Sequence, residues 1–210
     1  ILREFDDTFD LRLCSANIVP MPILKIARMG HPILAGIAAP VADPAAPQIK
    51  QLVADMIETM KDADGAGLAA PQVHTPLRVV VFQAPGERGE DGLSEAEKFD
   101  HTAPLTVLIN PVIEVLSEIV DGGWEGCLSV PGLRGWVERP SHIRYEGFDI
   151  SGNRISRTAR GFHARVVQHE CDHLDGILYP SRMHDMSKFL FESEADHWID
   201  KQKTHGGAGA

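Results

Sequence analysis

The sequence predicts one globular domain that combines helices with strands. Its 210 residues are 43% hydrophobic and 24% charged, which is ordinary for a globular protein and sufficient to bury a core. Residues 49–60 carry an apolar stripe with helical spacing, and Val79-Val80-Val81 is typical of a buried strand. The chain shows no internal repeat and no separable linker, so we expect a single domain.

The N-terminal part begins with a segment of uncertain role. Residues 1–20 have no clear period and precede a natural start at Met21, so we expect an extension that contributes little. Residues 32–47 are rich in proline and alanine and predict an irregular, extended lead-in. A helix should follow, either capped by Asp43 or starting later near Pro47. Its apolar stripe consists of Ile49, Leu52, Val53, Met56, Ile57 and Met60.

Hydrophobic runs predict three strands in the middle of the chain. They cover residues 77–82, 105–109 and 112–115, and Asn110-Pro111 should break the chain between the last two. Residues 85–102 contain glycines among many charges, which indicates a solvated surface loop without chemistry.

The C-terminal half predicts a hairpin followed by two helices. Residues 136–150 alternate well enough to pair, through a tight turn, with a strand at 154–158. One helix is expected over 161–176, and a last amphipathic helix over 186–203 precedes a frayed tail at 206–210.

Charge and cysteine content restrict the partners and the compartment. The formal net charge of −10 argues against a general affinity for DNA or RNA. No apolar run is long enough to cross a bilayer, and the acidic first twenty residues resemble neither a secretory signal nor a transit peptide. The odd set of Cys14, Cys127 and Cys171 does not form a disulfide framework, so we expect a reducing, bacterial cytoplasm.

The strongest chemical signal is the sequence His169-Glu170-Cys171-Asp172-His173. On a helix, His169 and His173 project from one face and can bind the same metal ion. Glu170 lies beside that face, where a carboxylate can accept a proton from metal-bound water without being a ligand. Cys171 should point away from the ion as a buried thiol.

A catalytic site commonly has three protein ligands and an open fourth position, so the two histidines need a partner. In one zinc-peptidase pattern the partner is a histidine six residues further on, but that position holds Tyr179. In another it is a glutamate on a later helix, here Glu192 or Glu194, and this keeps a metallopeptidase as the alternative. Cys127, presented from a glycine-flanked strand, offers a different solution. A structural zinc site in a non-enzymatic protein is a further alternative, although a fourth protein ligand would normally close it.

Three segments together resemble the motifs of the peptide deformylase family, in the family's order and at its usual separations. They are Gly65-Ala66-Gly67-Leu68-Ala69-Ala70-Pro71-Gln72, Glu125-Gly126-Cys127-Leu128-Ser129 and Gln168-His169-Glu170-Cys171-Asp172-His173. The resemblance covers residues 21–186, the expected catalytic domain. Residues 187–210 remain as a C-terminal helix and flexible tail.

The resemblance implies an α+β fold in which antiparallel strands pack around a central metal-bearing helix. It also implies that Cys127, His169 and His173 bind one divalent ion, often Fe²⁺, with Zn²⁺, Ni²⁺ or Co²⁺ as further candidates. The implied reaction removes the formyl group from nascent N-formylmethionyl polypeptides and releases formate.

Physical reasoning then assigns roles to three further residues. Glu170 would take the proton of the attacking water and deliver it to the departing amine. The side-chain amide of Gln72 and the backbone N–H of Leu128 would donate to the developing oxyanion.

Substrate binding is expected close to the helical motif. Phe162 and Val166 precede His169 by seven and three residues and share its face, so they should contribute an apolar pocket for the methionine side chain. The family usually has a larger aliphatic residue in place of Ala66, and Arg165 adjoins the motif helix, which leaves the shape of the groove open. The full set of expected substrate-binding residues is Ala66, Gly67, Gly126, Phe162 and Val166.

Four arginines near the motif helix raise the question of ribosome contact. Because the resemblance implies nascent chains, these residues are candidates for touching ribosomal RNA transiently, although a solvated face is the favoured interpretation. They are Arg154, Arg157, Arg160 and Arg165.

Overall fold

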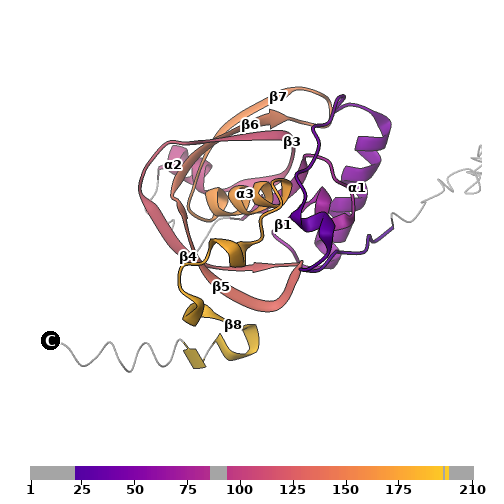
Figure 1. The fold of residues 1–210 in the computed structure, drawn as a ribbon. Helices are drawn as coiled ribbons and strands as arrows, with labels where there is room; N and C mark the ends of the chain where they lie inside the picture. Colours follow the sequence, from indigo (N-terminus) through magenta and orange to yellow (C-terminus); the bar gives the residue numbers. More distant parts are fainter. Residues whose placement is uncertain (1–21, 86–93, 196, 199–210) are drawn as a thin grey trace, which may run out of the picture.

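The structure is a computed structural model that describes residues 22–85, 94–195 and 197–198 (Figure 1). The expected N-terminal extension and the end of the chain therefore lie outside the described residues. Helix α3 (Gly161–Leu174) lies at the centre, with one sheet curving over it and a second sheet on its other side (Figure 1). This is the predicted α+β arrangement of antiparallel strands around the motif helix.

The larger sheet has five strands in the order β1-β2-β3-β6-β7, and every neighbouring pair is antiparallel. Its strands are β1 (Gly67–Ala69), β2 (Val79–Ala84), β3 (Ala103–Val115), β6 (His142–Phe148) and β7 (Arg154–Arg160). The smaller sheet has the antiparallel order β4-β5-β8. Its strands are β4 (Val120–Cys127), β5 (Val130–Pro140) and β8 (Phe189–Phe191).

Strand β2 separates two parts of the hydrophobic core. Val80 and Phe82 face α3, whereas Val79 and Val81 face α1 (Pro47–Asp62) on the other side of the sheet. Because successive side chains of a strand point to opposite faces, a strand buried on both sides must be continuously apolar. The motif helix is therefore held against a rigid, doubly buried strand.

The predicted first helix starts at the later of its two expected positions. Ala46 caps α1 and Pro47 occupies its first turn, where a missing N–H costs nothing. Asp43 instead accepts a hydrogen bond from the backbone of Ala45 in the preceding turn. The lead-in before α1 contains one 3₁₀ turn, η1 (Pro32–Ala35), and an isolated bridge from Ala39 to Leu77, and is otherwise irregular.

Two predictions in the middle of the chain are wrong. Asn110-Pro111 does not end a strand, because Asn110 adopts a positive φ of 53° and the chain continues through β3 with a bulge between Ile109 and Val112. The expected surface loop also contains a helix, α2 (Glu95–His101). Arg157 and Thr158 of β7 bond to α2 and to the residue that follows it, so tertiary contacts hold this polar segment.

The C-terminal half differs from prediction in two places. Residues 136–150 do not form one strand, because the chain passes after Pro140 from β5 in the small sheet to β6 in the large one. Residues 186–194 form η4 (Met186–Lys188), β8 and η5 (Glu192–Glu194) rather than the start of a long helix. The remaining 3₁₀ turns are η2 (Ala70–Val73) and η3 (Tyr179–Arg182).

None of the helices in the described ranges is both long enough and apolar enough to cross a membrane.

Candidate active site

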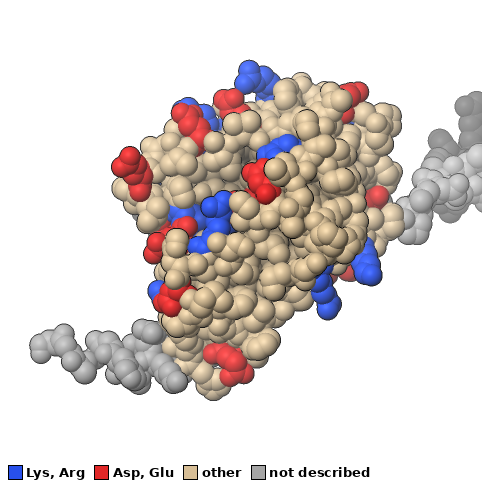
Figure 2. All heavy atoms as spheres, viewed as in Figure 1, with Lys and Arg blue, Asp and Glu red and all other residues tan. Residues whose placement is uncertain are grey.

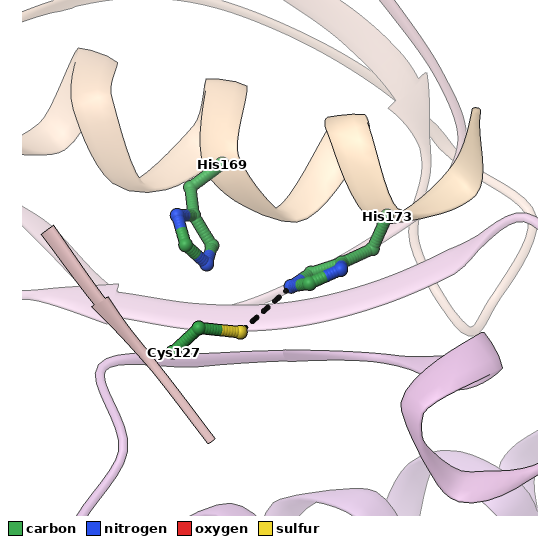
Figure 3. Close-up of side chains that lie close together, drawn as sticks. All are labelled: Cys127, His169 and His173. Carbon is green, nitrogen blue, oxygen red and sulfur yellow. Dashed lines mark hydrogen bonds between the residues drawn. The ribbon is translucent and has the colours of Figure 1, made fainter. Parts of the chain in front are cut away.

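Helix α3 presents its two motif histidines to a cysteine from the small sheet (Figure 3). The side chains of His169 and His173 project from the same face of the helix toward Cys127, and His173 Nε2 lies 3.3 Å from Cys127 Sγ. The ligand atoms of these three residues all lie within 4.8 Å of one another. One thiolate and two imidazoles suit a borderline or soft divalent ion, so the donor set fits a metal site.

A two-residue turn at the tip of the β4–β5 hairpin delivers the cysteine. Cys127 pairs with Val130, and Leu128 and Ser129 form the turn between them. The backbone N–H of Ser129 donates to Cys127 Sγ at 3.4 Å, and Gln72 Nε2 lies 3.5 Å from the same sulfur. The turn and Gln72 thus place two hydrogen-bond donors against the sulfur.

The side-chain amide of Gln72 is held at both ends. Its Oε1 accepts the backbone N–H of Ala69 at 2.8 Å, and its Nε2 donates to Ser129 Oγ at 3.1 Å. Gln72 is 1% exposed, so the amide cannot turn freely in solvent. A donor fixed in this way beside the cysteine costs no reorganisation during a reaction.

Glu170 buries its carboxylate at the wall of the site. Glu170 is 4% exposed, and its Oε2 has no hydrogen-bond partner among the described residues. Burial raises the pKa of Glu170 from 4.5 to about 7. A carboxylate with that pKa can take up and release a proton near neutrality.

Sequence reasoning missed Glu125 as an individual site residue, although it lies within one of the quoted motifs. Its Oε2 accepts from His169 Nδ1 at 2.9 Å, which leaves Nε2 of that ring for a metal ion. Burial raises the pKa of Glu125, but hydrogen bonds from Arg139 and His169 outweigh burial and hold it well below its usual range. The signal that could have identified Glu125 is its position two residues before Cys127 in the same motif.

Arginines compensate the negative charge behind the histidines. Arg139 donates to both oxygens of Glu125, at 2.6 and 2.9 Å, and to Asp172 at 2.8 Å. Arg182 also pairs with Asp172. A buried carboxylate remains ionised only when it is paired in this way, so the network keeps a charged acceptor against His169.

A cleft of about 510 Å³ opens between β1, the β4–β5 hairpin and α3. Except for His173, which lies deeper, it is lined by all the residues expected for the site: Ala66, Gly67, Gln72, Gly126, Cys127, Leu128, Phe162, Val166, His169 and Glu170. Trp124 and Arg134 also line it, and the sequence did not suggest them as cleft residues. Glu192, considered from the sequence as a metal ligand, lines it too. The cleft therefore brings together segments more than a hundred residues apart.

The other metal ligands considered from the sequence are engaged elsewhere. Glu192 accepts from Arg134 Nε at 3.0 Å, and Glu194 accepts from Ser193. Over the part of the chain that is described, the group able to hold a metal ion is Cys127, His169 and His173. The geometry thus offers no support for the glutamate ligand of a metallopeptidase.

The four arginines do not form one free basic patch. Arg154 pairs with Glu146, Arg160 lies 3.7 Å from Asp100, and Arg157 stacks over Phe99. Arg165 is turned inward to Glu125. On the face drawn in Figure 2, basic and acidic side chains likewise lie beside one another.

Comparison with known proteins agrees with the geometry. The family described as polypeptide deformylase matches residues 23–189. Peptide deformylase 1 of Bordetella pertussis is 54% identical over 167 residues, covering 80% of this chain and 91% of that protein. Peptide deformylase 2 of Ralstonia nicotianae is 52% identical over 170 residues, covering 81% and 90%.

Solved structures give the same result for the fold. Peptide deformylase from Ehrlichia chaffeensis superposes with a TM-score of 0.69 at 33% identity, covering 90% of this chain and 99% of that one. A class I type b peptide deformylase from Acinetobacter baumannii with Met-Ala-Ser bound has a TM-score of 0.68 at 35% identity, covering 78% and 99%.

Proposed function

We propose roles for individual residues from the premise that this chain belongs to the peptide deformylase family and removes the N-formyl group from the N-terminal methionine of nascent polypeptides. Cys127, His169 and His173 hold one divalent ion, Glu170 moves the proton, and Gln72 and Leu128 donate to the oxyanion. The observation that carries this assignment is the buried, unshared carboxylate oxygen of Glu170 beside the Cys/His/His group.

The chemistry divides between the ion and the protein. A divalent ion held by Cys127, His169 and His173 would acidify a water molecule and polarise the formyl carbonyl. Glu170 accepts the proton of the attacking water and then donates it to the amine nitrogen as the C–N bond breaks, which yields formate and a free methionine amine. Gln72 Nε2 and the N–H of Leu128 stabilise the negative charge that develops on the formyl oxygen.

We propose Fe²⁺ as the native ion, with Zn²⁺, Ni²⁺ or Co²⁺ as substitutes. The choice of iron rests on the family resemblance, and the mixed thiolate and imidazole donor set fits all four ions. Ferrous iron beside a thiolate is prone to oxidation, so activity lost in air and restored by Fe²⁺ with a reductant would favour iron.

The ligand set has a direct test in the metal content of variants. Cys127→Ser should lose the ion or hold it far more weakly, because a hydroxyl is a poorer ligand than a thiolate. Glu192→Gln should keep the ion. The opposite pattern would support the metallopeptidase ligand set instead.

Recognition of the substrate follows from the two sheet edges that border the cleft. Phe162 and Val166 supply an apolar pocket for the methionine side chain. β1 and β4 are terminal strands of their sheets, so backbone groups near Ala66, Gly67 and Gly126 are available to an extended peptide. The Met-Ala-Ser bound to the Acinetobacter baumannii relative supports a peptide ligand of this size.

Three wider assignments remain proposals. We assign the catalytic unit to residues 21–186, with 1–20 as an extension and 187–210 as a C-terminal segment; the family match over 23–189 supports these limits.

We place the reaction in the bacterial cytoplasm, since the relatives named above are bacterial and Cys127 and Cys171 are free thiols. Transient ribosome contact through Arg154 or Arg160 is tested by neutralising both and measuring binding to ribosomes at several salt concentrations.

The decisive experiment measures formate released from formyl-Met-Ala-Ser by protein purified without oxygen and loaded with Fe²⁺. Acetyl-Met-Ala-Ser is the substrate control, and Glu170→Ala is the protein control. We expect formate from the formyl peptide alone and a loss of about 10³-fold or more in the variant, with the ion retained. Metal loss in Glu170→Ala would show that this residue is a ligand rather than the base.

A further inference from the structure

Arg165 occupies an unexpected place for a charged residue, because it lies on the cleft face of α3. Phe162, Arg165, Val166 and His169 have the spacing of three, one and three residues that places side chains on one helical face. All four line the cleft. The side chain of Arg165 is nevertheless only 12% exposed.

The guanidinium of Arg165 is fixed by acceptors from both strands of the hairpin. Its Nη1 donates to Glu125 Oε1 at 2.8 Å and to the carbonyl of Val137 at 2.9 Å, and its Nη2 donates to the carbonyl of Asp121 at 2.7 Å. The planar fork of arginine suits several acceptors at once, and a lysine cannot reproduce it. Arg165 thus ties α3 to both β4 and β5.

Gly123 leaves the space that this guanidinium fills. A Cβ atom at Gly123 would lie 2.8 to 2.9 Å from the guanidinium atoms of Arg165. A side chain there would have to push the fork away from its acceptors. The glycine in β4 and the arginine in α3 are therefore complementary in shape.

We call the hydrogen bonds of the Arg165 guanidinium to Asp121, Glu125 and Val137 the clamp. The clamp is connected to a metal ligand through Glu125, whose side chain is 3% exposed. Oε1 of Glu125 accepts from Arg139 and Arg165, and Oε2 accepts from Arg139 and His169. These contacts use all four acceptor positions of the carboxylate. A shift of Arg165 would therefore disturb the orientation of Glu125 and of the ring that it holds.

We propose that Arg165 is a positioning and specificity-determining residue: its guanidinium, seated against Gly123, holds Glu125 toward His169, while its methylene chain forms part of the wall of the cleft beside Phe162 and Val166. This inference rests on the proposed function, since it assigns His169 to the metal ion and the cleft wall to the first side chain of the substrate. It couples the shape of the substrate pocket to the orientation of a ligand.

Three variants distinguish the role of the clamp from the role of the Arg165 methylene chain in the wall of the cleft. Arg165→Met removes the donors but keeps an unbranched chain, whereas Arg165→Ala removes both. Gly123→Ala leaves Arg165 intact and displaces its guanidinium. The matched control is Arg144→Met, which breaks an arginine–glutamate pair on the surface, where the arginine side chain is 42% exposed.

The first measurement is the affinity of metal-free protein for Co²⁺, read by titration, together with the visible spectrum of the bound ion. Arg165→Met, Arg165→Ala and Gly123→Ala should each weaken Co²⁺ binding by about 10-fold and alter the spectrum, because outer-shell partners of a ligand typically matter to this extent. Arg144→Met should match the wild type. The double variant Gly123→Ala/Arg165→Met should be no weaker than Arg165→Met, since both changes break the same contact.

The second measurement compares kcat/KM for formyl-Met-Ala-Ser and formyl-Phe-Ala-Ser. Only Arg165→Ala should shift the ratio toward the larger side chain, by about 10-fold. Unchanged Co²⁺ affinity and spectrum in all three folded variants would overturn the clamp, and an unchanged ratio in Arg165→Ala would overturn the wall. A wild type that binds Co²⁺ but releases no formate would contradict the proposed function instead, and the Co²⁺ results would still decide the clamp.

Discussion

Gly67 in β1 lies directly against the carboxylate of Glu170 in α3, so closely that a Cβ atom on Gly67 would overlap it. The proposed base thus occupies a space kept open by a glycine from a different motif. Because both residues are buried, the contact has little room to relax except toward the cleft that both residues line.

Gly67→Ala should therefore impair catalysis without removing the ion. We expect kcat to fall by about 10²-fold, since a displacement near 1 Å of a catalytic group has an effect of this size. Metal content and formate release are the measurements. Gly36→Ala is the control, because its nearest non-neighbouring atom lies 3.8 Å from the added carbon and its φ is −92°. Equal kcat values for Gly67→Ala and Gly36→Ala would contradict the expected effect of the Gly67–Glu170 contact on catalysis.

The pH dependence of activity should reflect Glu170. Burial raises the pKa of its carboxyl to about 7, and the base must be ionised, so kcat/KM should fall as the pH drops. A bound divalent ion favours the charged form and lowers this pKa, so the midpoint should lie at or below pH 7. The check is a kcat/KM profile from pH 5 to 9 with the ion held saturating. A rate that rises as the pH falls through this range would exclude Glu170 as the base.

Gln72→Ala should retain the metal and lose roughly 10²- to 10³-fold in kcat, which is the usual effect of deleting one oxyanion donor. Gln72→Glu is the sharper variant, because it keeps the acceptor for Ala69 but replaces the Nε2 donor. Both variants should be similarly slow on formyl-Met-Ala-Ser. Full activity in Gln72→Glu would show that the Nε2 group does not act.

A histidine remote from the metal site should make stability depend on pH. Burial lowers the pKa of His163 from 6.5 to about 4, and the ring bonds to Tyr145 and to the carbonyl of Asp100. The folded state favours the neutral ring, so stability is intact above pH 6.5 and falls as the pH decreases toward 4. The loss amounts to roughly 3 kcal/mol if the full shift is realised.

Urea unfolding of the metal-free protein at several pH values measures this effect. The difference in unfolding free energy between wild type and His163→Gln should shrink as the pH falls from 7 to 4, because the variant has no ring to protonate. A difference that is constant over this range would show that His163 does not titrate with folding.

Local patterns were sufficient to predict the motif helix and the hairpin of β6 and β7. The spacing of His169 and His173 is a property of any helix, and the turn residues between the two strands act locally. These features depend on neighbours within a few residues. The sequence therefore determines them without knowledge of the rest of the fold.

Long-range contacts account for what the sequence did not reveal. The bond between Glu125 and His169 joins residues 44 positions apart, and no periodicity reports it. Residues 136–150 alternate well enough to suggest one strand, yet Pro140 ends β5 and the chain changes sheets. Phe189–Phe191 pairs with β5, and this tertiary pairing overrides the helical pattern predicted for the segment.

The two-residue turn of Leu128 and Ser129 has a consequence for how this protein can evolve. One hairpin tip supplies the sulfur of Cys127, the N–H of Ser129 that contacts it, and the N–H of Leu128. Substitutions at the tip change one group at a time, whereas an added or deleted residue would slip the pairing with Val130 and turn the sulfur from its partners. Lineages of this protein should therefore keep the length of the tip constant, and length changes should accumulate in loops away from the cleft.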